Sequence, residues 1–215
     1  MPADNAVTLP NRGKTYLTGH TRTADATATT SKAIEGLIKV FSDIDYSSTT
    51  VGVKSRRSQG EVTGIMGRNT SGVALLPKMA VTWKLGQRGK QVDGYADFCP
   101  DRAIAGIVDE WLPAAGVPNN DYFWLTVRGP TLALTGKAAD GTNVIEVDDW
   151  LVNLTAAAST FSTTAGRVGP QVSVAGMTTD ITFGQSLNLY KFARAMSAKT
   201  TANTNANILI HVDLY

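Results

Sequence analysis

Residues 109–130 read DEWLPAAGVPNNDYFWLTVRGP, and this stretch contains three pieces of different character. The acids Asp109 and Glu110 end the run IVDE, and we expect them at the rim of a strand. Residues 112–121 carry two prolines and the turn-forming sequence NND, which together predict a stiff loop. Residues 122–129 (YFWLTVRG) are almost continuously apolar. They predict a strand that is buried on both faces, either between two sheets or against a neighbouring subunit.

Short apolar runs recur throughout the chain after residue 60, separated by Gly, Pro, Asn or Asp. They are EVTGIMGRN, MAVTWKL, QVDGYADF, AIAGIVDE, YFWLTVRG, PTLALTG, NVIEVDDWLVNLT, FARAMSA and NILIHVDLY. This spacing predicts a mainly β protein whose residues 61–215 form a compact β-barrel or β-sandwich core. Residues 79–85 and 208–215 alternate strictly, which predicts strands half-buried on one face, with His211 on an outward face.

The first 60 residues have a different character and are predicted to form an extended N-terminal arm followed by a protruding loop. Residues 1–32 show neither helical nor strand periodicity, so they form either a floppy terminus or an arm that orders against a neighbouring subunit. Residues 33–46 fit a helical stripe but also alternate, and Gly36 favours a strand from about 37 to 43. Residues 47–60 are polar with a basic tip, which indicates a protruding hairpin or loop that is either solvated or in contact with an acidic partner surface.

Four further segments are expected to lie between or beyond the strands. GRNTSG at 67–72 and LGQRGKQ at 85–91 predict tight turns. Residues 156–180 are small and polar and predict a long surface excursion, and a short helix is expected near 183–190.

The composition narrows the classes of function. The formal net charge is only +2 and charged residues make up 18% of the chain, so we expect no direct binding of nucleic acid. Cys99 is the only cysteine, which excludes a disulfide within the chain. We read no signal peptide at the N-terminus and no run long enough to span a membrane.

A search for catalytic or metal-binding groups favours a protein that is not an enzyme and holds no cofactor and no metal. The two histidines, His20 and His211, have no obvious local partner for a triad of nucleophile, histidine and carboxylate. The acid pairs at 109–110 and 148–149 point to opposite faces of a strand, so they are expected to be turn acids at strand ends. GRNTSG lacks the lysine of a phosphate-binding loop, and no calcium-loop pattern follows Asp43 and Asp45.

The four tryptophans are spread over separate runs and are expected to anchor the core. One alternative remains open. A carbohydrate-binding β-sandwich adhesion module would line its site with Trp111, Tyr122 and Trp124.

The order of five segments resembles that of the capsid decoration (cement) proteins of tailed bacteriophages. The segments are NTSGVALLPKMAVTW, GKQVDGYAD, IAGIVDEWLPAAGVPNNDYFWLTVRGPTLAL, NVIEVDDWLVNLTAAAS with TTAGRV, and FARAMSAKTTANTNANILIHVDLY. The resemblance covers about residues 67–215 and lies in the pattern and wording of these short sequence segments, not in a catalytic motif. It implies a β-tulip-like domain acting as a homotrimer on the outer surface of a phage head, where it clamps neighbouring subunits of the major capsid protein.

The resemblance also implies where the protein works. It would be found in the virion, and in the host cytoplasm during assembly. A major coat protein or a tail-tube protein is the alternative within the structural class. The residues expected to contact the capsid or a neighbouring subunit are Leu9, Tyr16 and Leu17 in the arm, Lys54, Arg56 and Arg57 in the basic loop, and Trp111 and Phe123.

Overall fold

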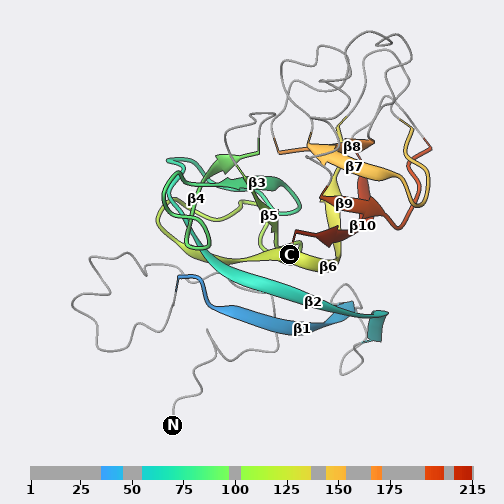
Figure 1. The fold of residues 1–215 in the computed structure, drawn as a ribbon, viewed down its shortest axis with the longest axis horizontal. Coiled ribbons are helices and arrows are strands. Elements are labelled where there is room, and N and C mark those ends of the chain that lie inside the picture. The colour runs from blue at the N-terminus through green and yellow to red at the C-terminus, as the bar shows by residue number, and fades with distance from the viewer. Residues whose placement is uncertain are drawn as a thin grey trace, which may run out of the picture.

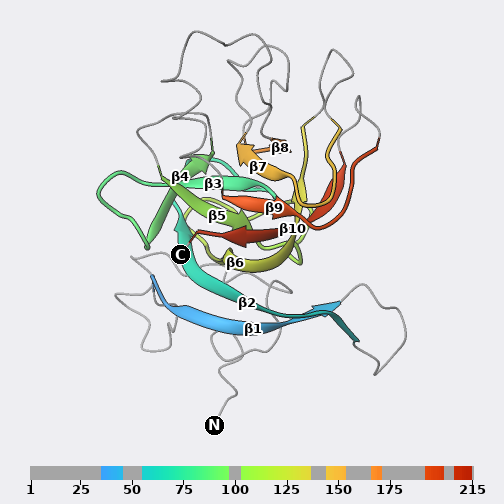
Figure 2. The ribbon, with the colours of Figure 1, turned by 45° about the vertical axis from the view of Figure 1, so that its right-hand side comes forward.

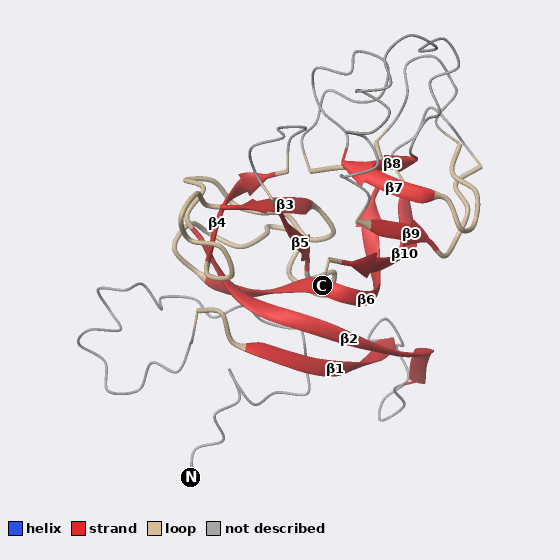
Figure 3. Ribbon diagram, in the orientation of Figure 1, coloured by secondary structure: helices blue, strands red, loops and turns tan. Residues whose placement is uncertain are grey.

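The structure is a computed structural model, and it describes residues 35–45, 55–96, 103–136, 144–153, 166–170, 192–200 and 206–214. These residues form strands and turns without a helix (Figure 3), which confirms the mainly β prediction. The ten strands are β1 (Ile38–Asp45), β2 (Ser55–Asn69), β3 (Ala80–Trp83), β4 (Gln91–Tyr95), β5 (Ile104–Val108), β6 (Tyr122–Leu134), β7 (Trp150–Asn153), β8 (Val168–Pro170), β9 (Ala193–Ala195) and β10 (Asn207–Asp213).

The strands belong to one sheet that closes on itself twice. In the first circuit, β2 pairs with β4, β4 with β3, β3 with β5, β5 with β6, and β6 again with β2. In the second circuit, the far half of β6 pairs with β10, followed by β9, β7 and β8. A single bridge between Thr135 and Val168 returns the second circuit to the end of β6. Register shifts interrupt the first circuit at several points, so the sheet as a whole is not a regular barrel.

Strand β6 is shared by both circuits, and a bend at Gly129 separates its two halves. Gly129 has a φ of 98°, a region that residues with a side chain rarely adopt. A Cβ atom at this position would overlap the carbonyl oxygen of Glu61 on β2. The bend needs glycine for both reasons, and it lets one strand that continues to Leu134 serve two small cores (Figure 1).

Both faces of the first half of β6 are buried, as the sequence predicts. Phe123, Leu125 and Val127 point into the first circuit. Tyr122 and Trp124 lie on the opposite face and pack with Phe41 of β1. The second face of 122–129 therefore packs on aromatic and apolar side chains of the same chain.

The strand β3 differs from its prediction, because all four of its residues are buried instead of alternate ones. Val81 and Trp83 pack inside the first circuit, whereas Ala80 packs in the cluster of the second circuit. Closing the sheet twice places an apolar core on each side of β3, which is why the polar-looking face is covered. The last strand, β10, does alternate, and His211 is exposed as predicted.

The predictions for the first 60 residues are partly confirmed. Strand β1 confirms the expected strand at 37–43. Of the protruding hairpin or loop predicted at 47–60, residues 55–60 belong to β2, which pairs antiparallel with β1 as one strand of a hairpin, and residues 47–54 lie outside the described residues. Strand β2 also runs through position 60, where we placed the end of the arm. The arm at 1–32, the helix near 183–190 and most of the excursion at 156–180 lie outside the described residues.

The predicted turns are found, with one change. Residues 112–121 form a loop in which the amide of Gly116 donates to the Pro113 carbonyl, and Asn120 adopts a φ of 72°. The stretch 85–91 is the turn between β3 and β4. In GRNTSG, β2 continues to Asn69, so the turn begins later than predicted. The Asn69 side chain organises this turn by donating to the carbonyls of Val73 (2.7 Å) and Val117 (2.9 Å).

Candidate functional site

The β1–β2 hairpin is the part of the chain that extends the sheet beyond the first circuit. Figures 1 and 2 show its two long strands running together along one side of the molecule, below β6 in both views. Strand β1 pairs with β2 from Ile38 opposite Ile65 to Asp45 opposite Ser55. On one face of β1 the side chains of Ile38 and Val40 are 60% and 58% exposed. Two neighbouring β-branched side chains thus stand on the same open face of a strand.

The opposite face of the hairpin is held on β6 by an aromatic contact. The rings of Phe41 and Trp124 meet edge to face, with centroids 5.0 Å apart and planes at 77°. Both rings lie over Gly64 of β2, where an added Cβ would be 3.1 Å from the Phe41 ring and 3.2 Å from the Trp124 ring. Edge-to-face contacts of this kind add stability beyond the area they bury. Glycine at position 64 therefore makes room for the contact that fixes the hairpin.

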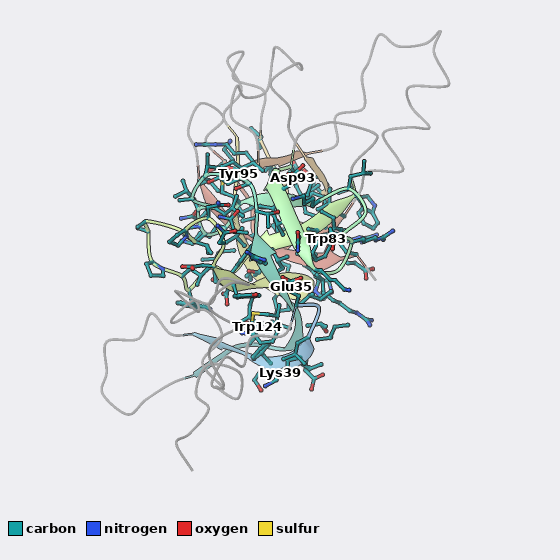
Figure 4. The ribbon with its side chains drawn as sticks, turned by 90° about the vertical axis from the view of Figure 1, so that its left-hand side faces the viewer. Glu35, Lys39, Trp83, Asp93, Tyr95 and Trp124 are labelled. Atoms are coloured by element: carbon teal, nitrogen blue, oxygen red, sulfur yellow. The ribbon has the colours of Figure 1, made fainter. Side chains whose placement is uncertain are left out.

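The start of β1 is anchored by a cluster of charged and polar groups at the edge of the first circuit. The Glu35 carboxylate lies 3.7 Å from the Arg68 guanidinium, and both side chains are mostly buried. Arg68 also donates to the Asn120 side chain (3.1 Å), and Gln91 donates to Glu35 (3.4 Å). Figure 4 shows Glu35 lying between Trp83, on the side of the circuit, and Lys39, on the hairpin. This cluster therefore attaches the residue before β1 to the first circuit.

Only two of the predicted contact residues in the arm and the basic loop lie among the residues that the structure describes. Leu9, Tyr16, Leu17 and Lys54 lie outside the described residues. Arg56 and Arg57 belong to β2, and the backbone of Arg56 lies opposite Ile44 at the far end of the hairpin. The two arginines are therefore on the same hairpin as Ile38 and Val40, toward the end remote from the Glu35 anchor.

The two predicted contact residues outside the first 60 are not brought together. Phe123 is 1% exposed because it packs in the core of the first circuit, so its side chain has no surface to offer a partner in this structure. Trp111 is partly exposed, at the start of the loop after β5. Tyr122 and Trp124 are 2% and 7% exposed, so they do not form an accessible row with Trp111 as the carbohydrate alternative requires.

The acids at 109–110 are buried, which corrects the expectation that they lie at a rim. Asp109 and Glu110 are 0% and 6% exposed. Glu110 accepts hydrogen bonds from the Thr131 hydroxyl (3.3 Å) and the Leu132 amide (3.4 Å) on β6. The Asp109 carboxylate accepts from the Trp111 amide (3.2 Å). Both acids therefore fix the loop after β5, and the partners of Glu110 explain its burial.

The second acid pair is exposed or half-buried and behaves as predicted. Asp148 has a φ of 72°, and the Asp149 carboxylate accepts from the Glu146 amide (2.8 Å), as turn acids do. No group of three or more metal-binding side chains occurs within the part of the chain that the structure describes.

A buried lysine was not anticipated from the sequence. Lys199 is 3% exposed and its ammonium donates to the Gly136 carbonyl at 2.7 Å. Burial lowers the pKa of Lys199 below the ordinary lysine value. Burial likewise raises the pKa of the Tyr95 hydroxyl, which accepts from the Leu76 amide and donates to the Ala74 carbonyl. Both groups tie a loop to the sheet.

Comparisons with known proteins do not identify a family. No protein-family model matches this chain, and no curated protein is detectably similar to it. Within the described ranges, no helix is long and apolar enough to cross a membrane.

Proposed function

We propose that this protein is a capsid decoration protein, which binds the outer surface of a tailed-phage head and clamps neighbouring subunits of the major capsid protein. The proposal includes a β-tulip-like reading of the two fused circuits and a homotrimeric assembly. It places the protein in the virion, with the host cytoplasm as the site of assembly. It includes neither catalysis nor a cofactor.

The observation that carries the proposal is the β1–β2 hairpin. It is attached to the body by the Phe41–Trp124 contact and the Glu35–Arg68 pair, so it is held firmly although it projects beyond the first circuit. Its open face presents Ile38 and Val40, and Arg56 and Arg57 lie on its β2 strand. A hairpin whose strands carry both apolar and cationic residues suits a protein surface that carries carboxylates.

A repeating shell favours this kind of contact. Each copy needs only a modest affinity, because many copies bind one lattice and each links subunits that are already held together. The body that presents the hairpin has three buried clusters and a shared central strand. A firm body with a projecting hairpin suits the mechanical role of a clamp better than the role of an enzyme.

The test is reconstitution on phage heads that lack this protein. Wild-type protein is mixed with mature heads, which are then pelleted and imaged by electron cryomicroscopy. We expect density on the outer surface, and we expect Ile38→Asp with Val40→Asp, or Arg56→Glu with Arg57→Glu, to weaken binding at least about tenfold. Leu85→Asp is the matched control, because Leu85 is 84% exposed on the turn between β3 and β4.

Two outcomes would overturn the proposal. One is a wild-type protein that does not bind the heads. The other is a purified protein that assembles alone into closed shells or tubes, which would favour a coat or tail-tube protein.

A further inference from the structure

Strand β1 is the outermost strand of the sheet, and its outer edge carries no further strand in the described part of the chain. Figures 1 and 2 show β2 lying between β1 and β6, and β1 pairs with β2 alone among the described strands. The Met66 amide donates to the Leu37 carbonyl at 2.8 Å, which sets the phase of the hydrogen bonds between β1 and β2. Alternate residues of an antiparallel pair bond to the partner strand, so the backbone groups of Ile38, Val40 and Ser42 point outward.

This outer edge is regular and open between Ile38 and Ser42. The register runs unbroken over that stretch, and the bulge in the pairing comes only after Ser42. Edge strands usually avoid a further strand by means of bulges, prolines or exposed lysines. The stretch contains no proline, and its lysine, Lys39, is half-buried. The side chains of Ile38 and Val40 are 60% and 58% exposed, so an added strand would meet open backbone beside apolar groups.

The residues just before β1 are bonded toward the body of the molecule. The Gly36 amide donates to the Met66 carbonyl of β2 at 2.8 Å, and Glu35 accepts from Gln91 of β4 at 3.4 Å. A Cβ atom on Gly36 would lie 3.0 Å from the Gly89 carbonyl oxygen, in the turn between β3 and β4. The residues that would form a tight turn onto the outer edge of their own β1 are therefore held against β2 and β4. This favours an arm that leaves β1 over one that folds straight back on it.

The arm supplies a segment of matching length and residue type. Residues 1–34 lie outside the described residues, and within them residues 14–18 read KTYLT between two glycines. Threonine and tyrosine favour extended backbone on a pleated surface. Residues 19–34 separate this segment from Glu35, and an extended chain of that length spans on the order of 50 Å. The segment is therefore long enough in its tether to reach the β1 strand of a neighbouring copy.

We infer that residues 14–18 of one copy add a strand to the outer edge of β1 in the next copy. The outward backbone groups between Ile38 and Ser42 bond to the backbone of the arm, and arm side chains lie beside Ile38 and Val40. An arm passed from each copy to the next is a head-to-tail contact, which closes as a ring of three, whereas two β1 edges joined to each other would close as a pair. The inference rests on the homotrimer of the proposed function and names the contact that joins its copies.

The first test joins the arm to the edge chemically in the full chain. A Thr15→Cys, Val40→Cys variant is made together with Cys99→Ser, so that the two new thiols are the only ones. The purified protein is treated with a short bismaleimide, which joins two thiols without requiring a single register. A denaturing gel and peptide mass spectrometry then identify the products. We expect covalent dimers and trimers from this variant, and monomers from each matching single-cysteine variant at the same concentration.

A proline at position 40 tests the backbone contact itself. The Val40 amide points away from β2, so Val40→Pro removes an outward donor and leaves the hydrogen bonds to β2 in place. We expect Val40→Pro to remain folded in thermal unfolding and to weaken association at least about tenfold in sedimentation velocity. Val40→Thr keeps the amide and the branched shape of the side chain, and it should associate to within about threefold of the wild type.

Four results would overturn the inference. They are a wild type that stays monomeric at about 100 µM, an associated protein that gives no cross-link, a cross-link confined to one chain, and a folded Val40→Pro protein that associates as the wild type does. Because these experiments contain no phage heads, they are independent of the test of head binding. A trimer without the arm contact would leave the decoration proposal standing, and a protein that exchanges arms but does not bind heads would do the reverse.

Discussion

Replacing Gly64 by alanine tests whether the aromatic contact holds the hairpin on the body. Gly64 lies in β2 between β1 and β6, and its φ does not exclude alanine. The new methyl group would lie 3.1 Å from Phe41 Cε2 and 3.2 Å from Trp124 Cε3. Carbon atoms in contact are normally about 3.5–4.0 Å apart, so at least one ring must move.

Two effects of opposite sign determine how much Gly64→Ala changes the free energy of unfolding. Overpacking a well-filled site usually lowers the free energy of unfolding by about 1–3 kcal/mol. Alanine also restricts the unfolded chain, which raises the free energy of unfolding by about 0.4–1 kcal/mol. Because the methyl group meets two rings that already touch each other, overpacking should dominate. We expect Gly64→Ala to lower the free energy of unfolding by about 1–2 kcal/mol.

The assay is urea unfolding followed by tryptophan fluorescence, to which Trp124 contributes together with the other three tryptophans. Phe41→Leu removes one of the two rings and should itself be destabilising by about 1 kcal/mol. In the double variant the methyl group occupies the vacated space, so the combined loss should be smaller than the sum of the two single losses by at least about 0.5 kcal/mol. Strict additivity, or a Gly64→Ala protein as stable as the wild type, would refute the reasoning.

Three other predictions concern different parts of the sheet. Burial lowers the folded-state pKa of Lys199, so the unfolded chain binds this proton more tightly than the folded chain does. The free energy of unfolding of the wild type should therefore rise as pH increases from that lowered pKa toward the ordinary lysine value. Lys199→Met should remove this rise, which urea titrations at several pH values would measure. Glu35→Gln should lower the free energy of unfolding by about 1–3 kcal/mol, because it leaves the mostly buried Arg68 charge without its carboxylate, and native-state hydrogen exchange should show faster exchange at the start of β1. Gly129→Ala should lower the free energy of unfolding by at least about 3 kcal/mol or prevent soluble expression. Gly72 has a similar positive φ of 82° but open space around it, so Gly72→Ala should lower the free energy of unfolding by only about 1 kcal/mol, as measured by thermal unfolding.

Local sequence patterns predicted those features that depend on neighbouring residues. The nearly continuous apolar run at 122–129 predicted burial on both faces, and the alternation at 208–215 predicted the exposed face of β10. The turn residues at 118–121 predicted the loop before β6, where Asn120 has a positive φ. Each of these signals is carried by side chains that are close in sequence.

Features that depend on distant partners were not predictable in the same way. Arg68 lies in a stretch that resembles a turn, yet it pairs with Glu35 and Asn120 from two other parts of the chain. The sequence around Glu110 predicted an acid at the rim of a strand, but its hydrogen-bond partners lie 21 and 22 residues further along the chain. The burial of Ala80 arises because a second circuit covers the far side of β3, and no local pattern encodes that closure.

The hairpin and the outer face of the second circuit lie on opposite sides of the Gly129 bend in β6. The first half of β6 carries Trp124, which holds the hairpin, and the second half carries Leu132, which lies opposite Leu209 of β10. A force applied to the hairpin therefore reaches the outer face through one continuous strand that is hydrogen-bonded along both halves. If the hairpin binds a shell, strand β6 carries the load from the hairpin to the second circuit. Loosening the bend at Gly129 should then weaken the clamp even where the hairpin surface is intact.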